Sequence, residues 1–543
     1  MRGNAAKYLM SAFSGLLLIF TFAPFNLYIL AWVAMVPFLL SIEGLSPKPA
    51  FKAGFLMGLC YFFGTTYWIY HSMHDYGGIG LVPSLLIVAA LAAYLSLYTA
   101  VFAVVYSSRI RHSRLPALFL APVFWVLLEY IRSYLFTGFP WSALGYSQWK
   151  FPAVIQIADI TGVYGISYLI VAVNAAIADF FILRRRLRLM PLYPVLYTVA
   201  GYVFLAGILA ATFTYGVYRL DEPRPGHPLR VSIVQGDINQ SVKWDQKYQN
   251  RVFGIYENLT AAADPVKPLS SPAPNPAISN SAAAWVTPPN PASDHPSASD
   301  RPPDLIVWPE SALPFLFDGR DPRVEQLEQT QQSMHIPLLI GAIRQRSNGR
   351  YANSAILIDG GRPAYIYDKI HLVPFGEYVP LKRVLFFVNG FSDAIGDLSG
   401  GSHYTDGGIG QDKFATAICY EMAFPGLVRK FFRDGGDFLV TITDDTWFGR
   451  STGPYQNFGI AALRAVENRK PVIRAANSGI SGFFTSTGLV IKKTPLFKRQ
   501  TLTATIMTDP TVTFYTRFGD LFAYLCILTA LFLLIFSDER ENF

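Results

Sequence analysis

The sequence predicts a multi-pass α-helical membrane bundle that carries a large water-soluble α/β domain. The 543 residues are 52% hydrophobic and 15% charged, with a mean hydropathy of +0.30, whereas soluble domains contain about 25% charged residues. Apolar stretches long enough to cross a bilayer fill residues 1–216 and recur near the C-terminus. Between them, residues 217–517 alternate short β-branched runs with helix-like stretches, a pattern typical of α/β domains.

Membrane spans need about 20 mostly apolar residues each. We expect eight, at 8–22, 27–45, 53–72, 82–107, 116–136, 161–183, 192–216 and 518–536. The first resembles a signal peptide in length, but no small-residue cleavage site opening a polar domain follows it, so we interpret it as a retained span. The chain then divides into a seven-span domain 1–216, a soluble domain 217–517, and a final span with its tail, 518–543.

The distribution of Lys and Arg predicts the orientation of these spans. Residues 1–216 contain 13 Lys and Arg but 5 Asp and Glu, so the net charge of +8 resides there. With a cytoplasmic N-terminus, eleven of these basic residues fall in inner loops and only Lys150 in an outer loop. This bias places 217–517 outside the cytoplasm and both termini inside. Because the basic residues lie between apolar spans, they do not indicate nucleic-acid binding.

The outer domain reads as buried strands alternating with helices. Apolar runs stand at 229–234, 305–308, 336–341, 352–358, 414–418 and 438–442, and helix-like stretches at 244–262, 322–334, 421–434 and 456–469. Such continuous apolar runs favour strands covered on both faces. Residues 264–303 depart from this pattern, with 11 prolines and no periodicity, and we predict a disordered insertion there.

The candidate nucleophile is Cys419, the only cysteine of the outer domain. It follows the apolar run 414–418 where a helix begins, so its side chain is expected at the carboxyl edge of a sheet, beside free helix N–H groups. Such groups stabilise a thiolate or an oxyanion. Taken alone, a lone cysteine is more often an inert core residue. With three cysteines in the chain, a disulfide scaffold is excluded.

Two more predicted strands are followed by charged residues that could take part in catalysis. Glu310 follows the run Leu305–Trp308, and Lys369 follows another apolar strand, with Glu377 in the loop behind it. A Glu, a Lys and a Cys converging at one sheet edge could act as general base, oxyanion stabiliser and nucleophile. The competing interpretation is a helix cap for Glu310 and a surface ion pair with Asp368 for Lys369.

These segments resemble a known family. Trp308-Pro-Glu310, Asp368-Lys-Ile-His-Leu-Val-Pro-Phe-Gly-Glu-Tyr378 and Ile418-Cys-Tyr-Glu421 resemble motifs of the nitrilase superfamily of carbon–nitrogen hydrolases. The chain looks most like the membrane branch, the apolipoprotein N-acyltransferases, because residues 135–148, 235–244, 446–449 and 453–456 also resemble segments of that family. The resemblance implies a nitrilase-like αββα sandwich for the outer domain, with no metal and no organic cofactor.

The resemblance also implies a role for each candidate. Glu310 would be the base, Lys369 the stabiliser of thiolate and oxyanion, and Cys419 the nucleophile. Supporting roles fall to Glu377, which would position the lysine, and to Tyr420 and Glu421 beside the nucleophile. Substrate or lid roles would fall to Trp141, Trp244, Trp447 and Phe448. The chain departs from the family pattern at Asp444, where Asn is usual, and at Asn457, where His is frequent.

The implied reaction moves an acyl chain from a membrane phospholipid to Cys419, and then to the α-amino group of a diacylglyceryl-modified cysteine at an apolipoprotein N-terminus. A bacterial inner membrane, a periplasmic catalytic domain and a monomer belong to this expectation, which includes no nucleic-acid partner. The first alternative is a membrane-tethered amidase in which water resolves the thioester. A transporter or scaffold with an inactive outer domain is the second, and a histidine acyltransferase using His295 and Asp300 is the third.

Overall fold

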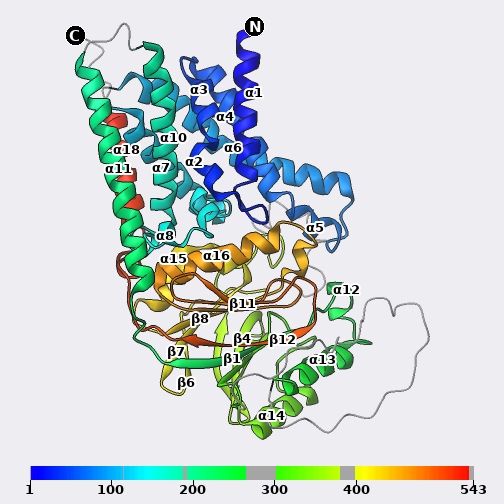
Figure 1. Ribbon diagram of the computed structural model, residues 1–543. Helices are drawn as coiled ribbons and strands as arrows, with labels where there is room; N and C mark the ends of the chain where they lie inside the picture. Colours follow the sequence, from blue (N-terminus) through cyan, green and yellow to red (C-terminus); the bar gives the residue numbers. More distant parts are fainter. Residues whose placement is uncertain (1, 114, 187–191, 264–300, 379–397, 537–543) are drawn as a thin grey trace.

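The computed structural model describes residues 2–113, 115–186, 192–263, 301–378 and 398–536. A helical bundle forms one end of the molecule and a two-sheet α/β domain forms the other (Figure 1). The first helix begins and the last helix ends at the far end of the bundle, away from the α/β domain. Of the insertion expected at 264–303, residues 264–300 lie outside the described part of the chain.

The bundle is built from helices of very different length. The elements are α1 Arg2–Ile19, η1 Tyr28–Leu30, α2 Ala31–Ala34, α3 Val36–Ile42, α4 Pro47–Thr66, α5 Ile69–His74, α6 Leu81–Ser108, η2 Ile110–His112, α7 Ala117–Tyr134, η3 Leu135–Thr137, η4 Leu144–Gln148, α8 Pro152–Ile155, α9 Ala158–Thr161, α10 Val163–Arg186, α11 Leu192–Asp221 and, after the α/β domain, α17 Phe514–Phe518 and α18 Leu521–Phe536.

Four helical segments are long and apolar enough to cross a membrane within the described residues: Leu81–Ser108, Ala117–Thr137, Val163–Arg184 and Val199–Asp221. They coincide with four of the expected spans. The stretch expected at 27–45 is instead divided among η1, α2 and α3, with Pro37 in the first turn of α3. The helices therefore establish a membrane-embedded bundle but not a count of eight spans.

Two six-stranded sheets form the α/β domain. The first has the order β12-β1-β2-β3-β4-β5 and the second β11-β10-β9-β8-β7-β6. In each sheet three central strands are parallel and the outer pairs are antiparallel. The strands are β1 Pro228–Gln235, β2 Leu305–Val307, β3 Leu338–Gln345, β4 Tyr351–Asp359, β5 Arg362–Asp368, β6 Asp406–Ile409, β7 Asp412–Ile418, β8 Phe438–Thr443, β9 Val472–Ala476, β10 Gly482–Phe484, β11 Val490–Lys493 and β12 Gln500–Met507.

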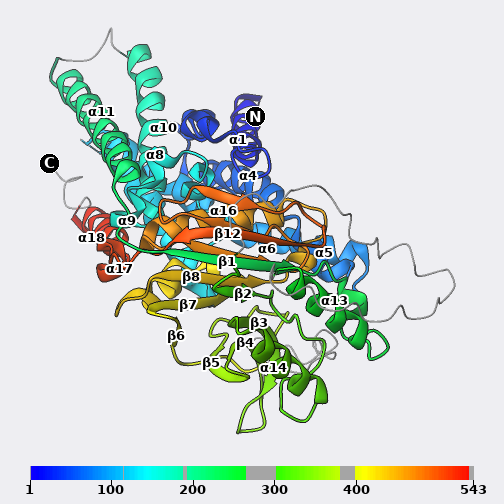
Figure 2. The ribbon, with the colours of Figure 1, turned by 60° about the horizontal axis from the view of Figure 1, so that its bottom comes forward.

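Helices cover the outer face of each sheet. On the first sheet lie α13 Gln249–Ala261 and α14 Pro322–Met334, and on the second lies α16 Gly453–Asn468, on the side of the bundle (Figures 1 and 2). The remaining helical elements are short: α12 Gln240–Lys243, η7 Cys419–Ala423, α15 Pro425–Val428, η8 Arg429–Phe432 and η9 Asp445–Phe448. The helix expected at 421–434 is thus broken into three turns, because Pro425 has no N–H to continue the hydrogen bonds of η7.

Helix α16 is buried on every side. All its residues except Tyr455 are buried, since one face packs on the second sheet and the opposite face packs on the bundle. Surface helices bury a single stripe, so this all-round burial marks α16 as the layer that joins the two parts. One hydrogen bond illustrates this join: the fully buried indole of Trp141 in the bundle donates to Oε1 of Gln456 in α16 at 2.7 Å.

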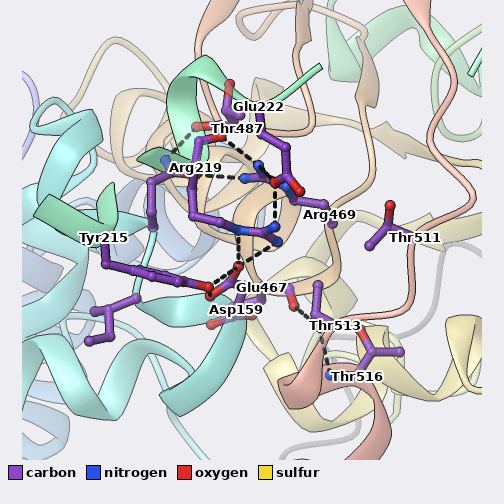
Figure 3. Close-up of polar contacts among 12 residues, drawn as sticks. Asp159, Tyr215, Arg219, Glu222, Glu467, Arg469, Thr487, Thr511, Thr513 and Thr516 are labelled. Carbon is purple, nitrogen blue, oxygen red and sulfur yellow. Dashed lines mark hydrogen bonds and ion pairs between the residues drawn. The ribbon is translucent and has the colours of Figure 1, made fainter. Parts of the chain in front are cut away.

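A second junction lies where α11 enters the α/β domain. We call Asp159, Tyr215, Arg219, Glu222 and Arg469 the interdomain polar cluster (Figure 3). The carboxylate of Asp159 accepts from Tyr215 and Arg219 at 2.9 Å each, and Arg469 donates to Glu222 at 3.1 Å and to the backbone oxygen of Arg219. Each guanidinium is therefore paired with a carboxylate, as buried charges require.

Candidate active site

The site begins with the turn after β2, which carries Glu310 into the space between the sheets. Its carboxylate is nearly buried, and three donors surround it: Oε1 accepts from Asn353 at 2.7 Å and Lys369 at 3.2 Å, and Oε2 accepts the N–H of Asp444 at 2.9 Å. This turn packs directly on β3. A Cβ at Gly341 would lie 2.3 Å from the backbone oxygen of Pro309, so only glycine allows the approach.

Lys369 stands between two carboxylates. It follows β5 directly, and its Nζ lies 3.2 Å from Glu310 and 3.0 Å from Glu377. Asn353 of β4 bridges the same two carboxylates, donating at 2.7 Å to Glu310 and at 2.9 Å to Glu377. The lysine side chain is 1% exposed, so its charge is balanced by the protein and not by water.

Cys419 directly follows β7 and begins η7 in the left-handed region, with φ of +53°. This conformation costs a non-glycine residue roughly 1 kcal/mol and is typical of residues that structure holds in place for function. The thiol is almost completely buried. Thr443, at the end of β8, interacts with the sulfur, and the charges of Glu310 and Lys369 act on it.

Glu421 explains why the cysteine and lysine strands end together. Its fully buried carboxylate accepts from the N–H of Ile418 at 2.7 Å, beside Cys419, and from the N–H groups of Ile370 and His371 at 2.7 and 3.0 Å, beside Lys369. The hydroxyl of Tyr367 donates to it at 2.8 Å. One carboxylate therefore joins the turn after β7 to the turn after β5.

The electrostatics define the resting protonation state. Burial, followed by the charge of Glu310, raises the pKa of the Cys419 thiol well above its usual value, and the Lys369 ammonium only partly opposes this. Burial lowers the pKa of Lys369, but the carboxylates of Glu310 and Glu377 outweigh it and raise that pKa overall. The resting site thus holds a neutral thiol and a charged lysine, and forming a thiolate requires a base that takes the proton.

The aromatic candidates lie around this core. Trp447 and Phe448 are half-buried in η9, where Trp447 packs edge-on to Tyr76 and Phe448 packs against Trp68 of the bundle. Trp244, also half-buried, ends α12.

Tyr420 connects the turn that carries Cys419 to the helical bundle. Its hydroxyl donates to the backbone oxygen of Gly138 at 3.3 Å, and Tyr146 donates to that of Ala423 at 3.4 Å.

The structure thus brings Glu310, Lys369, Cys419, Glu377 and Glu421 together, with Tyr420 beside them. The sequence interpretation missed Asn353 and Lys243. Asn353 lies inside a mostly apolar strand, and only the register of β4 against β5 directs it at the carboxylates. In the part of the chain that the structure describes, no cluster of three His, Cys, Asp or Glu side chains could hold a metal ion.

The arrangement has the parts of a covalent acyl-transfer site: a thiol at a strained strand end, a carboxylate with several donors, and a lysine beside both. Together with the two-sheet α/β domain, this arrangement is that of the carbon–nitrogen hydrolase class. Residues 230–512 match the carbon–nitrogen hydrolase family, and residues 14–176 match the apolipoprotein N-acyltransferase N-terminal domain.

Relatives extend this similarity over the whole chain. An apolipoprotein N-acyltransferase of Geobacter metallireducens is 37% identical over 98% of this chain and 96% of its own length. One of Haemophilus influenzae is 31% identical, covering 98% of this chain and 94% of its own length. The chain belongs to the apolipoprotein N-acyltransferase family. Among solved structures, Nit3 of Saccharomyces cerevisiae, a nitrilase-superfamily member, aligns with 58% of this chain and 97% of its own at 16% identity and a TM-score of 0.37.

Proposed function

We propose that this protein transfers an acyl chain from a membrane phospholipid to the N-terminal α-amino group of diacylglyceryl-modified apolipoproteins. One observation carries the proposal: a buried thiol adjoins a lysine held between two carboxylates, in a chain that matches apolipoprotein N-acyltransferases over nearly its full length. The reaction proceeds in two halves through a thioester on Cys419. The relatives and the membrane bundle do not favour the tethered amidase.

In the first half, Glu310 accepts the thiol proton while the sulfur of Cys419 bonds to the carbonyl carbon of the phospholipid ester. The resulting oxyanion is stabilised by the Lys369 ammonium and the backbone N–H of Tyr420. When the ester C–O bond breaks, Glu310 returns the proton to the leaving oxygen, which releases a lysophospholipid. The neutral resting thiol makes the base necessary, because little thiolate exists without it.

In the second half, the α-amine attacks the thioester carbonyl carbon. Glu310 accepts a proton from the amine, the C–S bond breaks, and that proton returns to the sulfur of Cys419. The product is an amide and the enzyme is restored. Glu377 positions Lys369 throughout, and Glu421 holds the nucleophile turn. Trp244, Trp447, Phe448 and Trp141 form the substrate cleft and its lid, which excludes water from the thioester.

The proposal includes a topology. Eight spans place residues 217–517 in the periplasm of a bacterial inner membrane, with both termini in the cytoplasm and the protein acting as a monomer. Membrane confinement brings the enzyme and two lipid-anchored substrates into one plane. A membrane-impermeant thiol reagent tests the orientation: it should label Lys413→Cys in spheroplasts and Arg184→Cys only after permeabilisation, and the reverse result contradicts the topology.

Acyl transfer is tested with protein in phospholipid micelles and a diacylglyceryl lipopeptide, followed by mass spectrometry. Wild type and Cys60→Ser, which changes a cysteine of α4, should both yield an acylated enzyme and an N-acylated peptide. Cys419→Ser should yield neither. Release of free fatty acid with an unmodified peptide would establish a hydrolase instead, and wild-type behaviour of Cys419→Ser would refute the mechanism.

A further inference from the structure

A second buried ion pair lies behind Glu310. The ammonium of Lys243 is 2.5 Å from Oδ2 of Asp444, and the two side chains are 0% and 3% exposed. The other oxygen of Asp444 accepts from Thr446 and Asn477, so both oxygens of this carboxylate are hydrogen-bonded. A fully buried pair costs desolvation energy and contributes little stability on its own, which raises the question of what else it does.

Both members of the pair contact Glu310. Lys243 donates to the backbone oxygen of Glu310 at 3.3 Å, and the N–H of Asp444 donates to its carboxylate at 2.9 Å. The pair therefore holds Glu310 both at its backbone oxygen and at its carboxylate.

The Lys243–Asp444 pair also lies next to the two segments that carry Trp244 and Trp447. Lys243 immediately precedes Trp244, and Asp444 caps η9, which carries Trp447 and Phe448. One ion pair thus connects the base to the two segments proposed to cover the substrate.

We propose that Lys243 is a positioning residue for acylation, which balances the charge of Asp444 and, together with it, holds Glu310 aimed at the thiol. This inference rests on the proposed function, because it assigns Glu310 as the base. Lys243 acts through Glu310 and Asp444 and does not touch the reacting atoms.

The sign of each perturbation follows from the charges around Glu310. Two further charges act indirectly: Asp445, which is paired with Arg474, acts on Cys419, and Glu421 acts on Lys369. The titratable groups that face Glu310 or Asp444 directly are Lys243, Lys369, Glu377, Cys419, Asp444, Tyr76 and Tyr256. Removing the Lys243 charge leaves a carboxylate unbalanced beside the base, which disfavours ionised Glu310. Removing the Asp444 charge leaves an ammonium unbalanced, which favours it.

The test measures acylation of Cys419 by phospholipid micelles in a single turnover, by intact mass, as a function of pH. Lys243→Met should move the acid limb of the rate profile up by about one pH unit, and Asp444→Asn should move it down by about one unit. The double variant Lys243→Met/Asp444→Asn should return the limb to the wild-type position. If Lys243→Met does not fold, the other two variants still carry the test.

Lys470→Met is the matched control. Lys470 is equally buried and donates to the backbone oxygen of Asp509, without contact to Glu310, so its loss should lower stability and leave the acid limb in place. Loss of rate in both single variants without movement of the limb, or a double variant worse than either, overturns the inference. Failure of the proposed function appears separately, as no acyl-enzyme in wild type or undiminished acylation of Cys419→Ser.

Discussion

We predict that Asn353→Leu shifts the acid limb of acylation to higher pH. Asn353 is almost fully buried, and its amide donates to Glu310 at 2.7 Å and to Glu377 at 2.9 Å. Leucine has a similar shape and no donor. The substitution removes one of the three donors around the Glu310 carboxylate and leaves Lys369 as the group that still bridges the two carboxylates.

The magnitude follows from the kind of bond that is lost. A hydrogen bond to a charged acceptor contributes about 1.5–3 kcal/mol net, and we take about 2 kcal/mol because two donors remain on Glu310. Donors stabilise the ionised carboxylate, so their loss favours the protonated form. At about 1.36 kcal/mol per pH unit, the limb should move up by about 1.5 units, and the rate below it should fall roughly thirtyfold.

The assay is the rate of Cys419 acylation across the pH range, measured by intact mass. Asn174→Leu is the control, because Asn174 is also fully buried and donates two hydrogen bonds, but both go to backbone oxygens, of Ala31 and Ile170. It should lose stability and keep the wild-type limb. An Asn353→Leu profile whose acid limb stays within about 0.3 units of wild type would show that this amide does not govern the base.

Three further predictions concern stability. Arg469→Met removes one cation from the interdomain polar cluster and leaves the buried Oε1 of Gln156 without its donor, while Glu222 keeps Arg219 as a partner. The loss of about 2 kcal/mol should lower the melting temperature by a few degrees, and an unchanged temperature would contradict a structural role of the cluster. Leu339→Ala empties a fully buried position of β3 and should cost about 3 kcal/mol, measured by denaturant unfolding, and a cost below about 1 kcal/mol would contradict tight packing between the sheets. Burial, followed by the charge of Lys369, lowers the pKa of His371 to about 4. The unfolded chain therefore takes up this proton first as the pH falls, and stability should decline between about pH 6.5 and pH 4. His371→Leu should flatten that decline in melting temperature, and an equally steep decline in the variant would argue against a neutral, half-buried imidazole.

The candidate site residues at the strand ends could be predicted from the sequence because they closely follow apolar runs. Trp308, Ile366 and Ile418 belong to such runs, and Glu310, Lys369 and Cys419 come within a few residues of their ends. The reason why these three strand ends meet in the fold is only partly contained in local sequence patterns. The carboxylate of Glu421 joins two turns, and it does so through backbone N–H groups that any sequence would possess.

Other features were not readable, for identifiable reasons. The edge strand β11 is exposed along its whole length, and β6 is short with two glycines, so neither shows an apolar run. The spacing at 456–469 predicted a helix and the structure has one, but its burial on all sides depends on the bundle packing over it. Lys243 looks like a surface residue in the sequence, since only the fold brings Asp444 to it across 201 positions.

The attachment of the α/β domain to the bundle has a consequence for selectivity. The nucleophile turn is bonded to the membrane part through Tyr420 and Gly138, α16 is enclosed by both parts, and Arg469 ties the end of α11 to the same domain. Under the proposed function, a sulfur atom fixed in this way would react with ester carbonyls at one depth of a lipid layer. Two phospholipids with different headgroups present that bond at nearly the same depth, whereas a lipid whose ester lies deeper or shallower does not. The attachment of the two parts would then select acyl donors by the position of their ester along the membrane normal.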